Sequence, residues 1–196
     1  MLELLNSCAW AFDFPILDWI HEVFGCKFMD ILMPIITLFG DGGIFWIACA
    51  VVVLFFPKTR KCGLTMGLAL VMGVVICNMI MKPIIGRPRP VDLLATKDIV
   101  LPFAVKVMHD FSFPSGHTIA SFEASVAILM YNKKLGIPAV ILAVLISFSR
   151  LYLYVHYVTD VLVSVVLGTA FALIAYAILR NVKLPEGRKK GKYEAA

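Results

Sequence analysis

Long apolar runs, separated by short polar and charged segments, dominate the chain from residue 42 to residue 180. A bilayer core needs about 20 apolar residues in a helix, and a helix satisfies its own backbone hydrogen bonds in lipid. The pattern therefore predicts an all-α transmembrane helix bundle, in which the shorter first and third runs are extended by their flanks. The predicted spans are 42–56, 63–81, 118–131, 135–155 and 157–179.

The first 41 residues have a different pattern, because acids and a proline interrupt their apolar runs. Asp13 and Pro15 break any span there, and the stretch 28–39 is apolar but too short. Two interpretations stay open. We favour N-terminal amphipathic helices that lie on or dip into the membrane, and the alternative is one extra tilted span. The bundle is thus expected to have five or six spans.

Composition supports a membrane protein. The 196 residues are 61% hydrophobic and 16% charged, whereas a soluble domain has about half apolar and a quarter charged residues. We expect one domain over residues 1–196, with an N-terminal segment 1–41, a transmembrane core 42–180 and a basic tail 181–196. No cleavable signal peptide is recognisable, and the five cysteines lack the spacing of metal ligands.

Basic residues gather after the first, third and fifth predicted spans. They are Lys58, Arg60 and Lys61, then Lys133 and Lys134, then Arg180, Lys183, Arg188, Lys189, Lys190 and Lys192. With five spans these clusters share one face, which the positive-inside rule makes cytoplasmic. This predicts a multi-pass plasma-membrane protein with a cytoplasmic C-terminus. The tail directly follows a span, which favours anionic lipid headgroups or topology marking over nucleic acid.

Three polar segments fall at span ends on the opposite, extracytoplasmic face. They are K-P-I-I-G-R-P-R-P from Lys82, P-S-G-H from Pro114, and the segment from Ser149 to Asp160. Together they supply cations, histidines, a carboxylate and a turn that opens a helix. This inventory suits transfer of a phosphoryl group to a histidine.

The cations and the turn are candidates for binding phosphate. Arginine grips phosphate oxygens through a planar fork, and lysine adds a compact charge. Lys82, Arg89 and Arg150 can neutralise a phosphate as charge spreads onto its oxygens. Ser115 and Gly116 precede a helix, so backbone N–H groups and the positive helix end are expected to face the same anion.

The two histidines are expected to have separate roles. His156 and Asp160 are four residues apart, so the carboxylate can accept from one ring nitrogen and leave the other free to attack phosphorus. His156 is therefore the predicted nucleophile. His117 is the predicted acid for the leaving oxygen and then the base for water. We expect no metal and no cofactor, because the sequence has no matching ligand cluster.

Two residues near these segments have open interpretations. Asn78, one turn before Lys82, orients that lysine or caps a backbone group. Glu123 lies inside the third span, where it supports the site or faces a cavity of the bundle. Three other residues are interpreted as structural: Arg87 in an Arg-Pro turn, His21 and His109.

The ordered set K-x6-R-P, P-S-G-H, S-R-x5-H-x3-D resembles the type 2 phosphatidic acid phosphatase superfamily over residues 78–160. The resemblance implies the same assignments, with His156 phosphorylated, and metal-free dephosphorylation of isoprenoid or glycerolipid phosphates and pyrophosphates. Many members have six spans, which leaves the role of residues 1–41 open. The superfamily also includes soluble vanadium haloperoxidases, against which the apolar spans argue.

Two functional hypotheses from different classes follow. The first is an enzyme that hydrolyses a lipid phosphate or pyrophosphate, and the second is a non-catalytic lipid-phosphate binder or transporter. The joint presence of His117, His156 and Asp160 favours the enzyme. By analogy we favour undecaprenyl diphosphate as the substrate, with phosphatidylglycerophosphate or phosphatidate as alternatives. The oligomeric state is left open.

Overall fold

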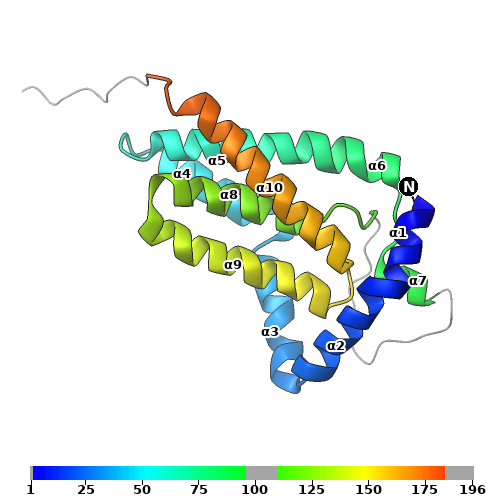
Figure 1. The fold of residues 1–196 in the computed structure, drawn as a ribbon. Helices are drawn as coiled ribbons and strands as arrows, with labels where there is room; N and C mark the ends of the chain where they lie inside the picture. The colour runs from blue at the N-terminus through cyan, green and yellow to red at the C-terminus, as the bar shows by residue number, and fades with distance from the viewer. Residues whose placement is uncertain (1, 96–109, 184–196) are drawn as a thin grey trace, which may run out of the picture.

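A computed structural model describes residues 2–95 and 110–183 of the chain (Figure 1). The described residues form helices and turns, without a strand among them. This confirms the predicted all-α class. His109, part of the segment between Lys82 and His117, and the tail from residue 184 onward lie outside the described residues.

The core of the molecule is a bundle in which α8 is central. Its helices are α4 (Ile44–Leu54), α5 (Arg60–Met72), α8 (Gly116–Tyr131), α9 (Lys133–Tyr152) and α10 (Val158–Leu179). Helix α8 packs against the other four, and Figure 1 shows them running along one common direction. Helix α5 continues through a π-helical segment, Gly73–Met81, into the short α6 (Lys82–Ile85).

The helices agree with the predicted spans to within a few residues. Four helical runs are long and apolar enough to cross a membrane: Lys27–Leu54, Arg60–Ala95, Lys133–Tyr152 and Val158–Leu179. Helix α8 has 16 residues, fewer than the roughly 20 that a bilayer core requires. The number of spans therefore stays a prediction. Large apolar side chains such as Val166 and Ile178 are exposed on the outside of the bundle, as lipid contact requires.

The first apolar run begins earlier than expected. It includes α3 (Lys27–Leu38), which we had grouped with the N-terminal segment, and it bends in the 3₁₀ turn Asp41–Gly43. Gly42 and Gly43 have φ of 57° and 67°, a left-handed conformation that glycine adopts without a steric penalty. The two glycines therefore allow α3 and α4 to point in different directions.

The N-terminal helices lie across one end of the bundle. Figure 1 shows α1 (Leu2–Cys8) and α2 (Phe14–Phe24) there, beside α7 (Pro90–Ala95). Phe14 and Leu17 are buried against Tyr154, Tyr157 and Leu94. Helix α2 is thus packed onto the turn between α9 and α10, which carries part of the candidate site.

The described residues of the predicted basic clusters lie at the other end of the bundle. Lys61 Nζ donates to the carbonyl of Arg180 at 3.0 Å, which joins the start of α5 to the end of α10. Lys58 and Asn132 line one cavity there, and Asn132 caps the start of α9 just before Lys134. Figure 1 shows the α4–α5 and α8–α9 connections at this same end. The described members of the three predicted clusters therefore lie at one end of the bundle, while Arg188, Lys189, Lys190 and Lys192 lie outside the described residues.

Candidate active site

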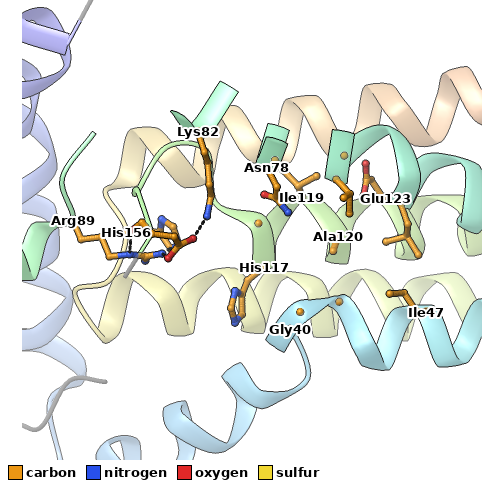
Figure 2. Close-up of a pocket in the computed structure, with 17 residues that line it drawn as sticks. Gly40, Ile47, Asn78, Lys82, Arg89, His117, Ile119, Ala120, Glu123 and His156 are labelled. Atoms are coloured by element: carbon orange, nitrogen blue, oxygen red, sulfur yellow. Dashed lines mark hydrogen bonds and ion pairs between the residues drawn. The ribbon is translucent and has the colours of Figure 1, made fainter. Parts of the chain in front are cut away.

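The three predicted polar segments meet in one cavity at the end of the bundle that the N-terminal helices cover. The cavity has a volume of about 350 Å³, and its lining includes Lys82, Arg89, His117 and His156. Figure 2 shows these side chains, contributed by three stretches of chain that lie far apart in the sequence. Gly116, Asn78 and Glu123 line the same cavity.

His156 lies in the turn between α9 and α10 and is buried. Its Nδ1 is 3.4 Å from Ser112 Oγ and 3.5 Å from Asp160 Oδ2. Its Nε2 is 3.2 Å from Arg89 Nη1. One ring nitrogen therefore faces the carboxylate, as predicted, and the other faces a cation that can hold a phosphate.

We expect His156 and Asp160 to be joined across one turn of helix, but the structure joins them in another way. His156 precedes α10, and Asp160 in the first turn of that helix accepts from the backbone N–H of Tyr157 at 3.1 Å. This reciprocal cap fixes the carboxylate beside the imidazole. Ser112 also donates to Asp160 Oδ2. The spacing in the sequence predicted the proximity of His156 and Asp160 correctly, but the helix cap, and not a helical turn, produces it.

The surroundings of His156 favour its neutral form. Burial lowers the pKa of His156 well below its ordinary value, and the charges of Arg89, Arg150 and Lys82 lower it further. A protonated imidazole has no lone pair for attack on phosphorus. The site therefore keeps the predicted nucleophile in its reactive state over the neutral pH range.

Lys82 and Arg89 share an acid that the sequence analysis missed. Asp110 contacts Lys82 Nζ, and it accepts from Arg89 Nη2 at 2.6 Å. Burial alone would raise the pKa of Asp110, but Lys82 and Arg89 outweigh burial and hold that pKa below its usual range. Asp110 therefore stays charged and balances two cations at the position predicted for phosphate.

Arg150 is buried with part of its guanidinium unpaired. Its Nη1 donates to Thr37 Oγ1 at 2.6 Å. Its Nε and Nη2 have no hydrogen-bond partner within residues 2–95 and 110–183. A buried charged donor without a partner is costly, and an anion satisfies it. Arg150 thus has the free N–H groups that phosphate binding requires.

Ser115 and Gly116 begin α8, but they do not contribute equally. The backbone N–H of Ser115 donates to Ser164 Oγ at 2.8 Å, and Thr118 Oγ1 donates to Ser115 Oγ at 3.1 Å. The Ser115 amide is therefore engaged inside the bundle, contrary to the prediction that it faces an anion. Gly116 does line the cavity, so α8 faces the site with its first residue, Gly116, and not with Ser115.

His117 has an acidic partner that the sequence did not reveal. Its Nε2 is 2.8 Å from Asp41 Oδ1, across 76 positions of sequence. Burial, followed by the charge of Arg150, lowers the pKa of His117 to about 4, while Asp41 acts in the opposite direction. His117 precedes the apolar stretch 118–131. The negative charges of a bound phosphate would favour its protonated form.

Arg87 is the largest correction, because we had interpreted it as part of a turn. It is fully buried, contacts Asp160 Oδ1 through Nη1, and donates from Nη2 to Asp13 at 2.9 Å. It also lies over the ring of Tyr157, 3.7 Å from its centroid. Arg87 therefore fixes the carboxylate that faces His156. The signal in the sequence was Asp13, an acid within an apolar N-terminal run.

Glu123 and Asn78 lie along the inner wall of the cavity. Glu123 is buried, and its Oε1 has no hydrogen-bond partner within the described part of the chain. It lies so close to Gly73 that a Cβ there would be 2.3 Å from Oε1. The cavity that Glu123 faces is thus the site cavity itself. Lys82 contacts Asp110, while Asn78 lies beside Gly116.

Beyond the polar residues the cavity becomes apolar. Its wall here consists of Ile47, Leu70, Val74, Ile119 and Ala120. Ile47 and Val74, on α4 and the π-helical segment, are each about half exposed. An apolar tail attached to a phosphate in the cradle can therefore lie in this part of the cavity and continue into the bilayer.

No cluster of three or more His, Cys, Asp or Glu suited to a metal ion occurs within residues 2–95 and 110–183. The charges that could neutralise a phosphate here are those of Lys82, Arg89 and Arg150. The arrangement can thus hold a phosphate, attack it with a neutral imidazole and exchange a proton through a second imidazole.

Comparison with known proteins agrees with this geometry. The profile of the PAP2 superfamily matches residues 62–183. Undecaprenyl-diphosphatase BcrC of Bacillus subtilis is 32% identical over 148 residues, which make up 76% of this chain and 74% of the relative. Phosphatidylglycerophosphatase B of the same organism is 32% identical over 182 residues, with coverage of 84% and 78%. The crystal structure of a transmembrane PAP2-type phosphatidylglycerolphosphate phosphatase from B. subtilis superposes with a TM-score of 0.66 at 26% identity, and covers 93% of this chain and 94% of that one.

Proposed function

The chain belongs to the PAP2 superfamily, and on that premise we propose that it hydrolyses a lipid phosphate or diphosphate through a phosphohistidine on His156, without a metal ion. Its class, a membrane hydrolase of lipid phosphate bonds, is that of its relatives. The proposal adds the intermediate, the residue roles, the substrate and the side of the membrane.

In the first step, the Nε2 lone pair of His156 forms a bond to phosphorus. The bond from phosphorus to the oxygen of the lipid breaks, and His117 gives its proton to that oxygen. Asp160 and Ser112, on the other side of the ring, hold its orientation and stabilise the positive charge that develops on it. Arg89, Arg150 and Lys82 bind the phosphoryl oxygens, on which negative charge accumulates.

In the second step, water attacks phosphorus and the phosphorus–nitrogen bond breaks. His117, now neutral, takes the proton from that water, and inorganic phosphate leaves. His156 regains its lone pair. The same imidazole thus acts as acid in one direction and base in the other, as microscopic reversibility requires of a group in this position.

The observation that carries the proposal is the presence of an oriented, neutral His156 together with Arg150, whose guanidinium has unused donors in the described part of the chain. A buried imidazole kept neutral, with one nitrogen beside Asp160 and the other beside Arg89, is suited to attack. Arg150 Nε and Nη2, which lack a partner among the described residues, supply donors for the group under attack. A binder or transporter needs such donors but has no need of an oriented nucleophile.

For the substrate we propose undecaprenyl diphosphate, with phosphatidylglycerophosphate or phosphatidate as alternatives. The apolar wall of Ile47, Val74 and Ile119 supports a lipid tail attached to the phosphate. Relatives named for undecaprenyl diphosphate and for phosphatidylglycerophosphate have similar identity to this chain. The choice between them rests on the compact single domain and on the proposed outward site.

We further propose that the site faces the extracytoplasmic side of the plasma membrane. The described basic residues of the inter-helix connections, such as Lys58, Lys61 and Lys134, lie at the end of the bundle away from the site cavity, and basic loops stay in the cytoplasm. The test uses single cysteines at Glu22 and at Lys134 in a cysteine-free background. An impermeant maleimide added to intact cells should label the first and spare the second. Reversed labelling would place the site in the cytoplasm and refute an outward site.

The substrate test is a panel of the three lipids with purified protein in detergent, with and without EDTA. Phosphate release should survive the chelator, and vanadate should inhibit it by binding in the phosphate cradle. The ratio of kcat/KM values identifies the preferred lipid. Release of no phosphate from any phosphorylated lipid, by folded protein, would support the binder or transporter instead.

The intermediate can be trapped in the His117→Ala variant with p-nitrophenyl phosphate, whose leaving group needs little protonation, because loss of the base should slow hydrolysis of the phosphohistidine. Brief reaction with the radiolabelled compound should leave acid-labile, alkali-stable label on the protein. The label should be absent when His156 is also changed to alanine. Label that persists in the double variant would assign the nucleophile to another residue.

A further inference from the structure

The turn between α3 and α4 contacts the candidate acid directly. Asp41 begins this turn, and its Oδ1 lies 2.8 Å from His117 Nε2. A Cβ at Gly40 would lie 2.6 Å from His117 Cδ2, so the backbone there is packed against the ring. Gly42 and Gly43, both with positive φ, let the chain turn immediately after Asp41. The local sequence G-D-G-G thus places one carboxylate against one face of the site.

The same stretch of chain also holds a second site residue. Thr37, one turn before Asp41, accepts from Arg150 Nη1 at 2.6 Å. The end of α3 and the turn after it therefore contact both the proposed acid and a proposed phosphate ligand. This stretch lies before residue 62, where the match to the family profile begins. Its contacts give residues 37–41 a role in the site itself.

The charges around His117 leave Asp41 with a specific task. Arg150 on α9 and Arg89 before α7 both disfavour a protonated ring, and Asp41 is the acid that opposes them. His156 lies on the same cavity, and burial keeps it neutral. Because a carboxylate can only accept, the contact places a hydrogen on Nε2. Nε2 is therefore not free to exchange a proton with substrate.

We propose that Asp41 is the positioning residue of His117: its carboxylate accepts from Nε2, fixes the ring, and leaves Nδ1 to exchange the proton with the leaving oxygen and then with water. The inference rests on the proposed function and deepens it. In the first step the Nδ1 proton moves to the lipid oxygen as its bond to phosphorus breaks. In the second step a water proton returns to Nδ1 as the phosphorus–nitrogen bond breaks.

The test compares Asp41→Asn with wild-type protein on two leaving groups. A lipid alkoxide needs a proton to leave, and an aryl oxide such as that of p-nitrophenyl phosphate needs it much less. With phosphatidate as substrate, kcat/KM, which reports the first step alone, should fall about 10- to 100-fold, within what an acid catalyst contributes. With p-nitrophenyl phosphate the loss should be several-fold smaller. Equal losses on both substrates would indicate a merely structural role and overturn the proposal.

The pH profile provides a second readout. Asp41→Asn removes a negative charge beside the His117 ring and so disfavours its protonated form. The basic limb of the pH profile of kcat should therefore move to lower pH by about one unit. Asp41→Glu, which keeps the charge, should restore much of the activity and of the basic limb. The matched control is Asp30→Asn on α3, which removes a carboxylate charge that accepts from Tyr152 at 2.6 Å rather than from a histidine. Its basic limb should not move, and a shift as large as that of Asp41→Asn would refute the assignment.

Two further measurements separate this inference from the proposed function. Asp41→Asn should cause no additional loss of kcat in a His117→Ala background, and an additive loss would overturn the proposal. Nitrogen-15 NMR of the His117 ring should show the Nε2-protonated tautomer in wild-type protein and its loss in Asp41→Ala, which removes the acceptor side chain. This spectrum requires no turnover. If the wild-type protein has no phosphatase activity but the variant changes the tautomer, the proposed function alone is refuted. If the variant does not change the tautomer, the Asp41 inference is refuted.

Discussion

The two histidines of the site are each paired with an aspartate, but the pairs are built differently. His156 and Asp160 are both buried, and Asp160 is fixed by Arg87, Ser112 and the cap of α10. His117 and Asp41 meet at the side of the cavity, where the Asp41 side chain is 39% exposed. The first pair is assembled from neighbours in sequence and the second from residues 76 positions apart.

The difference agrees with the two proposed tasks. A nucleophile must keep one distance and one protonation state, which a buried and fully bonded partner provides. An acid that becomes a base must exchange protons with substrate and water, which requires access to solvent. Substitutions in the His156–Asp160 pair and in the His117–Asp41 pair should therefore reduce activity in different ways.

The largest expected effect separates the two histidines. His156→Ala should lower kcat by at least about 10⁴-fold, because no other side chain is placed to form the intermediate. His117→Ala should lower it by about 10²- to 10⁴-fold, the usual contribution of an acid–base group. Single-turnover phosphate release measures both. Near-normal activity of His156→Ala would refute the mechanism, and equal losses would remove the distinction between the roles.

Asp160→Asn should have the next largest effect. It keeps the nucleophile but weakens the control of its orientation and the stabilisation of its positive charge, so kcat should fall about 10²- to 10³-fold, less than for His156→Ala. Asp18→Asn is the control, since Asp18 accepts from Tyr154 rather than from a histidine. A loss in the control that matches that of Asp160→Asn would mean that both variants act through general disturbance of the turn.

Arg87→Lys tests the support behind Asp160. Lysine keeps the charge, but it cannot reproduce the fork that contacts Asp160, Asp13 and Thr159. We expect about 3 kcal/mol less stability, because buried carboxylates are left with fewer donors, and a kcat lowered about tenfold. Thermal unfolding in detergent, alongside the assay, measures both. Arg60→Lys, far from the cavity, is the control, and an unchanged Tm for Arg87→Lys would contradict this account.

The smallest expected effect concerns Asp110, which lies on the His156 side and balances the cations there. Asp110→Asn should lower KM for a lipid phosphate by about threefold to tenfold, because Lys82 and Arg89 no longer pair with a competing carboxylate. The two cations hold the pKa of Asp110 below its usual range. The effect should therefore be the same at mildly acidic and mildly alkaline pH. A raised KM would instead make Asp110 part of the substrate-binding surface.

The sequence predicted the parts of the site that are local motifs. The helical runs followed from hydropathy, and the positions of Lys82, Arg89, His117 and His156 on one cavity followed from their places at span ends on one face. Charged and titratable residues at span ends on one face can come together in only a few ways. Their catalytic roles stay predictions.

Partners from distant segments could not be predicted in this way. Asp41 reaches His117 because two glycines bend the chain, and Asp110 reaches Lys82 from the far side of a long connection. Neither pairing leaves a periodic trace in the sequence. Arg87 was missed because an Arg-Pro turn explains its position equally well, and only packing shows it buried between Asp13 and Asp160.

The Asp13–Arg87 ion pair limits how far the chain can be shortened from its N-terminal side without loss of activity. Both side chains are fully buried, and Asp13 also accepts from the backbone and hydroxyl of Thr159. A chain shortened to the profile-matched residues 62–183 would leave the Arg87 guanidinium partly unpaired behind the proposed nucleophile and would remove Asp41 from the proposed acid. For expression, tagging and fusion, the segment that carries Asp13 and Asp41 must therefore be kept.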